Sequence, residues 1–155
     1  VAQMLQANPE LTLAEAVEGA KDWIARAKMC FLPDNLEFLR AGGRVSNVAY
    51  LGSRILSLHP CIEILDGKLM ATKKYRGQMT KVAEKFIREF AEQYDLDREV
   101  LWLVYIIELD DKVRTVLAET AKACGFQTIH WIKAGGVITT HGGPAAFGLA
   151  GFSRR

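Results

Sequence analysis

The sequence predicts an α/β (α+β) domain in which helices pack against a mixed β-sheet. Two observations carry this prediction. Amphipathic helical patterns and short apolar runs follow one another in mixed order along the chain, which is typical of a sheet with helices against it. In addition, 50% of the 155 residues are hydrophobic and 25% are charged, as in folded domains and unlike disordered chains. We therefore expect residues 1–155 to form one domain.

The N-terminal third predicts a helix, a strand and a second, short helix. Thr12–Glu15 has the spacing of a capping box, which marks a helix start. Met29–Leu32 is a short apolar run that we expect as a buried strand, and Asp34 is expected to cap a short helix that Gly42 ends. The first helix carries an apolar stripe at helical spacing, formed by Leu13, Val17, Ala20, Ile24 and Ala27.

The middle of the chain predicts a helix, a hairpin and a long helix. Ser46 is a good first residue for a helix that runs to about Leu56. Cys61–Leu65 and Lys68–Tyr75 flank Asp66-Gly67, which is the strongest short hairpin signal. A long amphipathic helix is then expected from about Gln78 to Tyr94.

The C-terminal third predicts four strands around one helix. Leu101–Ile107 is a continuous apolar run, the pattern of a central strand covered on both faces. Asp110 or Asp111 is expected to cap a helix that ends at Gly125. Three further strands are expected, at Thr128–Ile132, Val137–Thr140 and Phe147–Phe152.

Composition excludes several classes of protein. The net charge of +2 gives no basic face for nucleic acid. The three cysteines form no C-x-x-C pair, so we interpret them as reduced thiols of a cytoplasmic protein without a disulfide or metal site. The longest uncharged run, Ala134–Ser153, is too rich in glycine for an integral membrane segment. Because the chain starts at Val1 and ends just after an apolar segment, we expect it to be a piece of a longer protein.

Two glycine-flanked segments are candidate anion sites. In Gly42–Ser46, the glycines permit close approach, and Arg44 offers a forked donor for a carboxylate or phosphate. In Thr139–Pro144, His141 follows two hydroxyl residues in a glycine-rich turn, where its imidazole can donate to an anionic oxygen. The alternatives are a solvated arginine between two helices and a structural histidine. We interpret the other histidines, His59 and His130, as structural.

A third candidate is the basic and aromatic segment Lys73–Gly77, which precedes the long helix. Cations oppose the dipole at a helix N-terminus, so an anion bound nearby would account for them, and a solvated charged face is the alternative. Motifs for a serine nucleophile, zinc protease, P-loop or dinucleotide site do not occur. The sequence therefore favours anion binding over turnover, and we assign no catalytic residue, metal or cofactor.

Taken in order, these segments resemble the DegV family of bacterial fatty-acid-binding proteins, which serve fatty acid kinase systems in phospholipid synthesis. The resemblance covers nearly the whole chain. Each motif is weak alone, but their order and spacing are specific. They are Leu36–Leu39, Gly42–Ser46, Ala49–Gly52, Leu56–Pro60, Asp66-Gly67, Lys74–Gly77 and His141–Pro144.

The resemblance implies the C-terminal lobe of a two-lobed protein, with the N-terminal lobe absent. It implies that the protein is not an enzyme: a long-chain fatty acid lies in an apolar tunnel, and its carboxylate is presented to a separate kinase subunit, which makes the acyl phosphate. His141 is then the carboxylate-binding histidine, and Arg44 and Arg76 line the carboxylate or phosphate end. The implied ligand-binding set is completed by Thr140, Gly142 and Gly143. The kinase is expected on the face bearing Arg44, Lys73, Lys74 and Arg76.

The chain departs from the family's His-Thr-Gly-Pro-Gly pattern at two positions. Gly142 stands in place of the threonine, which removes a hydroxyl donor, and Ala145 stands in place of the last glycine. Two other functions stay open on the sequence. One is a phosphotransferase-type enzyme domain that uses His141. The other is a regulatory or interaction domain with a degenerate lipid pocket.

Overall fold

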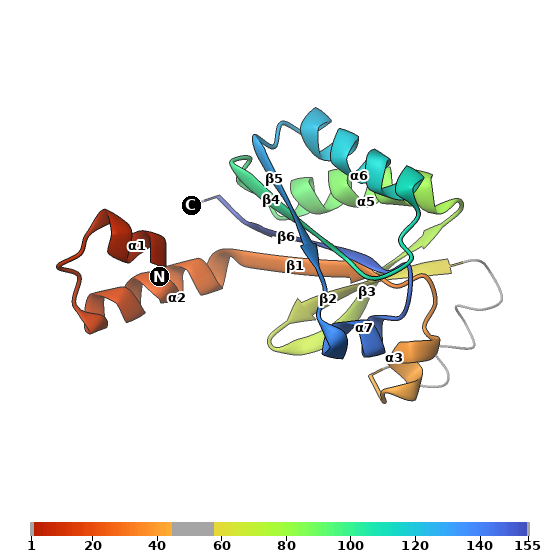
Figure 1. Cartoon of the computed structure of the whole chain (residues 1–155), viewed down its shortest axis with the longest axis horizontal. Coiled ribbons are helices and arrows are strands. Elements are labelled where there is room, and N and C mark those ends of the chain that lie inside the picture. Colours follow the sequence, from red (N-terminus) through yellow and green to blue (C-terminus); the bar gives the residue numbers. More distant parts are fainter. Residues whose placement is uncertain (1, 45–57, 155) are drawn as a thin grey trace.

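A computed structural model describes residues 2–44 and 58–154 (Figure 1). Within them, six strands form one mixed sheet in the order β3-β2-β1-β6-β4-β5. The strands are β1 (Ala27–Leu32), β2 (Leu58–Leu65), β3 (Lys68–Arg76), β4 (Val100–Tyr105), β5 (Thr128–Lys133) and β6 (Phe147–Phe152). The helices are α1 (Ala2–Ala7), α2 (Leu13–Arg26), α3 (Glu37–Ala41), α5 (Met79–Gln93), α6 (Asp111–Ala123) and α7 (Gly136–Gly142).

The sheet confirms the predicted mixed α/β architecture. Strand β1 pairs antiparallel with both β2 and β6, and β6 pairs antiparallel with β4. Only the pair between β4 and β5 is parallel among the described strands. The helix expected from Ser46 lies outside the described residues.

Helices α5 and α6 cover one face of the sheet and enclose the main core (Figure 1). The boundaries of both helices agree with the sequence, and Asp110 caps α6 by accepting a hydrogen bond from the Lys112 N–H. In the core, the Phe86 ring packs edge-on against Tyr75 and Phe147. These contacts fix α5 on the sheet.

The expectation that β4 is covered on both faces is wrong. Leu101 and Leu103 point to the α5 side and are buried, whereas Trp102 and Val104 on the other face are only half-buried. The reason is that α5 and α6 lie together on one side, while the short helices α3 and α7 reach only one end of the opposite face (Figure 1). That opposite face is called the open face below.

The predicted hairpin is confirmed. Strands β2 and β3 pair from Leu58↔Arg76 to Leu65↔Lys68, with a bulge at Cys61/Ile62. Asp66 and Gly67 both have positive φ, 49° and 73°, as a two-residue type I′ turn requires.

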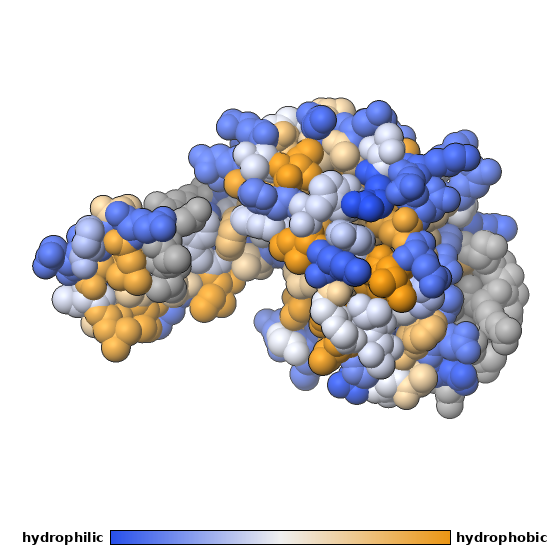
Figure 2. All heavy atoms as spheres, viewed as in Figure 1, coloured by the Kyte–Doolittle hydropathy of each residue, from blue (hydrophilic) through white to orange (hydrophobic). Residues whose placement is uncertain are grey.

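The N-terminal arm, α1 and α2, extends away from the body before α2 continues into β1 (Figure 1). The capping box is confirmed, since Thr12 and Glu15 exchange hydrogen bonds between side chain and backbone. The apolar stripe of α2 stays at the surface: the exposed fraction is 80% for Leu13 and 73% for Ile24. Figure 2 shows hydrophobic residues gathered on the surface of the arm.

Two local predictions are wrong. Asp34 does not cap α3: the N-cap position is Leu36, and the Glu37 N–H donates a hydrogen bond to Asn35 Oδ1 at 2.9 Å. The expected strand Val137–Thr140 is the helix α7. The topology explains this helix: β6 lies on the far side of β4 from β5, so the chain must pass the end of β4 before it enters the sheet.

We predict that stability falls as the pH rises between about 10 and 12. Burial and a hydrogen bond to the Glu63 carboxylate raise the pKa of Tyr94 to about 12. A raised pKa stabilises the fold below the unfolded value of about 10, and the contribution is lost as the phenol ionises in the folded state. Urea unfolding across this pH range measures the effect, and Tyr94→Phe is expected to flatten the curve. An identical slope in the variant would show that Tyr94 does not contribute.

Candidate functional site

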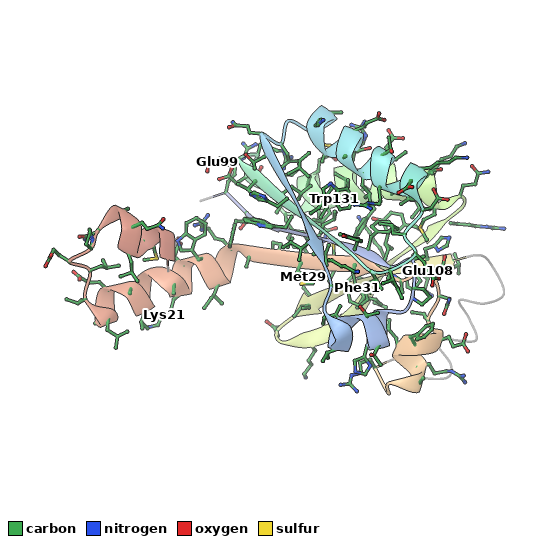
Figure 3. All side chains as sticks on the ribbon, viewed as in Figure 1. Lys21, Met29, Phe31, Glu99, Glu108 and Trp131 are labelled. Atoms are coloured by element: carbon green, nitrogen blue, oxygen red, sulfur yellow. The ribbon has the colours of Figure 1, made fainter. Side chains whose placement is uncertain are left out.

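An apolar cavity of about 280 Å³ lies between the open face and the two short helices. Its floor comes from alternate residues of β1, β4 and β6, namely Met29, Phe31, Val104 and Gly148. Figure 3 labels Met29 and Phe31 along β1. One wall is α7, with Val137, Ile138 and His141, and hairpin residues Ile64 and Leu69 stand at another edge. The cavity therefore has the lining that an apolar ligand needs.

Among the described residues that line the cavity, His141 and Arg44 are the only ones with a charged or titratable side chain. Both side chains lie against Gly42. Its carbonyl accepts a hydrogen bond from the Arg44 guanidinium, and a Cβ built on Gly42 would lie 2.3 Å from His141 Nδ1. The imidazole thus lies directly on the Gly42 backbone. Two segments that are almost a hundred residues apart in sequence meet at one corner of the cavity.

The His141 Nδ1 atom is buried and has no hydrogen-bond partner among the described residues. This atom faces the Gly42 backbone and is sealed from solvent, so a group bound in the cavity would meet another part of the imidazole ring. The neighbouring guanidinium adds a permanent positive charge. This corner of the cavity is suited to an anionic group.

A second glycine contact holds α3 against α7. A Cβ built on Gly143 would lie 2.4 Å from Phe38 Cδ2, and the φ of Gly143 is +78°. Both the contact and the backbone conformation therefore require glycine at this position. Gly143 acts as a packing residue, and it is not among those that line the cavity.

The two departures from the family pattern have structural counterparts. A Cβ on Gly142 would lie 2.6 Å from Ile106 Cδ1, so the isoleucine occupies the space that a threonine side chain would need. Ala145 has a φ of +60°, a conformation in which glycine is more stable than alanine. The cavity wall is thus more apolar at Gly142 than the family pattern implies.

The other predicted site residues lie elsewhere. Arg76 is at the end of β3 away from the hairpin turn and does not line the cavity. The Thr140 hydroxyl donates to the Gly136 carbonyl within α7. Lys73 forms an ion pair with Glu89 of α5 at 3.1 Å. The basic segment is therefore divided between the two sides of β3, because Lys74 and Arg76 alternate with Lys73 and Tyr75.

The remaining histidines are placed outside the cavity. His130 is exposed and stacks on Trp102. His59 Nε2 lies 3.3 Å from the Gly77 carbonyl oxygen, and its Nδ1 has no partner among the described residues. Sequence reasoning missed the strand residues of the cavity floor. The continuous apolar run of β4 was the available signal, because it places apolar side chains on both faces of the strand, including the open face that lines the cavity.

Two searches of the described residues were negative. They contain no cluster of three histidine, cysteine or acidic side chains placed to hold a metal ion. None of their helices combines the length and apolar character needed to cross a membrane.

The fold and the cavity define a mixed α/β domain with an apolar ligand pocket. The model of the family described as "Uncharacterised protein, DegV family" matches residues 1–154. The chain therefore belongs to the DegV family, and the predicted resemblance is confirmed.

Curated relatives agree with this assignment. A DegV domain-containing protein of Deinococcus radiodurans is 30% identical over 129 residues, which cover 81% of this chain and 44% of the relative. A protein of Thermotoga maritima named "Fatty acid-binding protein" is 28% identical over 124 residues, which cover 79% of this chain and 42% of the relative. The chain spans about half the length of the curated relatives it matches.

Solved structures share the fold. A DegV family protein from Eubacterium eligens, loaded with heptadecanoic acid, superposes with a TM-score of 0.84 at 18% identity, covering 98% of this chain and 54% of that chain. The Streptococcus pneumoniae Fatty Acid Kinase (Fak) B3 protein, loaded with linoleic acid, superposes with a TM-score of 0.78 at 12% identity. This second match covers 96% of this chain and 52% of that chain.

We predict that Ala145→Gly stabilises the protein by about 1 kcal/mol, because an L-residue in the left-handed region costs about that much and glycine does not. Urea unfolding of the variant and the parent measures the difference. Ala118→Gly, in the helical conformation of α6, is the matched control. It is expected to lose about 1 kcal/mol. Equal losses in both variants would contradict the strain at Ala145.

Proposed function

We propose that this chain is a fatty-acid-binding domain whose ligand places its acyl chain in the apolar cavity and its carboxylate at His141 and Arg44. The single observation that carries the proposal is the charge pattern of the cavity, which is apolar throughout except at this one corner. Such a site distinguishes the two ends of an amphipathic molecule.

The energetics favour an acyl chain. Each methylene removed from water contributes about 0.8 kcal/mol, so a long chain supplies most of the affinity. The carboxylate must stay hydrogen-bonded when it leaves water. The Arg44 guanidinium and an N–H of His141 are the donors that the cavity offers. They determine which end of the ligand is presented.

We also propose that the domain works with a further lobe and with a separate kinase subunit. The chain spans about half the length of its relatives, and both the α2 stripe and the open face present apolar residues that a second lobe would cover. A structural neighbour is named as part of a fatty acid kinase, which supports a kinase partner. In this proposal the kinase subunit catalyses the phosphorylation of the bound fatty acid.

The basic residues Arg44, Lys74 and Arg76 are the proposed kinase-facing set. Lys73 also belonged to the predicted face, but Glu89 already pairs with it. Charge reversal at Lys74 is therefore the more informative test of kinase docking, because reversal at Lys73 also removes an intramolecular contact.

We predict that His141→Ala in the full-length protein weakens binding of hexadecanoic acid by about tenfold to a hundredfold, the value of a hydrogen bond to a charged group. Isothermal titration with delipidated protein measures the affinity. His130→Ala is the matched control, because His130 is exposed and lies outside the cavity.

Hexadecanol provides a second control, because it has the same chain without the carboxylate. Its affinity is expected to change by less than about threefold in His141→Ala. Unchanged affinity for the acid would contradict the role of His141, whereas equal losses for acid and alcohol would indicate a damaged cavity. Transfer of label from a phosphoryl donor to the protein alone would favour the enzyme alternative.

A further inference from the structure

We propose that the acyl chain leaves the cavity along β6 and ends against an aromatic wall, so that Ala150 and Phe152 determine the preferred chain length. This inference rests on the proposed function and names two residues outside the cavity lining as determinants of ligand choice. It follows from the sheet register, from the cavity volume and from the aromatic contacts of Phe152.

The register shows where the cavity floor continues. Gly148, Ala150 and Phe152 alternate along β6 and therefore share the open face. Gly148 lines the cavity, and Ala150 is the next residue on that face. Ala150 lies between Met29 of β1 and Trp102 of β4 in the pairing. Ala150 thus carries only a methyl group between two large side chains, next along the open face from Gly148 of the cavity.

The cavity is too small to hold the whole acyl chain of a long fatty acid. A dry protein cavity of about 150 Å³ accepts a six-carbon aromatic ring. A cavity of about 280 Å³ therefore holds on the order of eleven carbons by the same measure. A structural neighbour is loaded with heptadecanoic acid, which has 17 carbons. A ligand of that length in this chain would extend several carbons beyond the cavity.

The path ends at a rigid aromatic wall. The Phe152 ring meets Trp102 edge-on with 5.6 Å between ring centroids, and it meets Trp23 of α2 in the same way at 4.7 Å. Behind them, the Arg26 guanidinium lies 4.5 Å from the Trp23 ring centroid, donates to the Ser153 carbonyl and pairs with Asp22. Methylene groups placed beside a charged group gain no favourable burial, so the aromatic wall sets the end of the path.

The alternative direction for the tail is toward Leu69 and Ile138, which line the cavity at the hairpin and α7 and are exposed, with exposed fractions of 39% and 54%. The path along β6 is preferred because aromatic rings stand at its end, whereas Leu69 and Ile138 face solvent. The experiment below includes this direction as an alternative outcome.

The test measures affinities of delipidated full-length protein for decanoic and octadecanoic acid. In Ala150→Leu, the larger side chain blocks the path next to Met29. Because each buried methylene contributes about fourfold to the binding constant, loss of two or more methylenes weakens octadecanoic acid at least about tenfold. Decanoic acid, which the cavity itself accommodates, is expected to stay within about twofold. Ala150→Val is measured in parallel, so that the result does not depend on Leu being tolerated.

Three further variants make the result specific. Ala118→Leu changes a partly buried alanine on α6, across the sheet, and is expected to leave both affinities unchanged. Phe152→Ala removes part of the wall and is expected to improve icosanoic acid relative to octadecanoic acid by at least about threefold. Leu69→Trp obstructs the alternative direction; because Leu69 also lines the cavity, this variant is expected to change the affinities for decanoic and octadecanoic acid by the same factor.

The outcomes separate this inference from the proposed function. A wild-type protein that binds neither acid contradicts the proposed function itself. A wild-type protein that binds both, with Ala150 and Phe152 variants that keep its chain-length profile, contradicts only the path along β6. Selective loss of octadecanoic acid in Leu69→Trp assigns the tail to the alternative direction and likewise overturns the inference.

Discussion

Both long C-terminal helices pack on the same face of the sheet, and the rest of the structure depends on this one-sided cover. Phe86, Phe147 and their neighbours fill the α5 side, so the core is complete without the other face. The open face still carries apolar side chains at alternate positions of β1 and β4. Exposed apolar surface of this kind marks a binding site or an interface. The cavity is a consequence of it.

Close backbone packing converts this apolar face into a site with two distinct ends. Gly42 and Gly143 allow α3 and α7 to approach until His141 lies on the Gly42 backbone and Phe38 on Gly143. The contact gathers the charged groups at one corner, while the strands supply the apolar floor. A larger residue at either glycine would push the two helices apart. The geometry of this corner thus depends on two positions that themselves carry no functional group.

Local signals predicted most of the elements, and topology decided the rest. The Asp66-Gly67 turn, the capping box at Thr12 and the amphipathic pattern of α5 are short-range features, and all three are confirmed. The α7 segment has β-branched residues and no local sequence signal for a helix. It is helical because the chain must pass around the end of β4. Arg44 and His141 were identified separately, and their meeting at Gly42 depends on tertiary packing that no local pattern encodes. Arg76 is also a cationic hydrogen-bond donor suited to a carboxylate or phosphate, but it lies away from the cavity.

The most direct test of this account is where a fatty acid contacts the protein. Methyl groups labelled with carbon-13 report this in solution, through their shifts when hexadecanoic acid is added to the full-length protein. The account predicts shifts at Met29, Ile106 and Ile138, which line the cavity, and none at Ile87, which is buried on the α5 side. Shifts confined to the α5 side, with the cavity methyls unchanged, would contradict it.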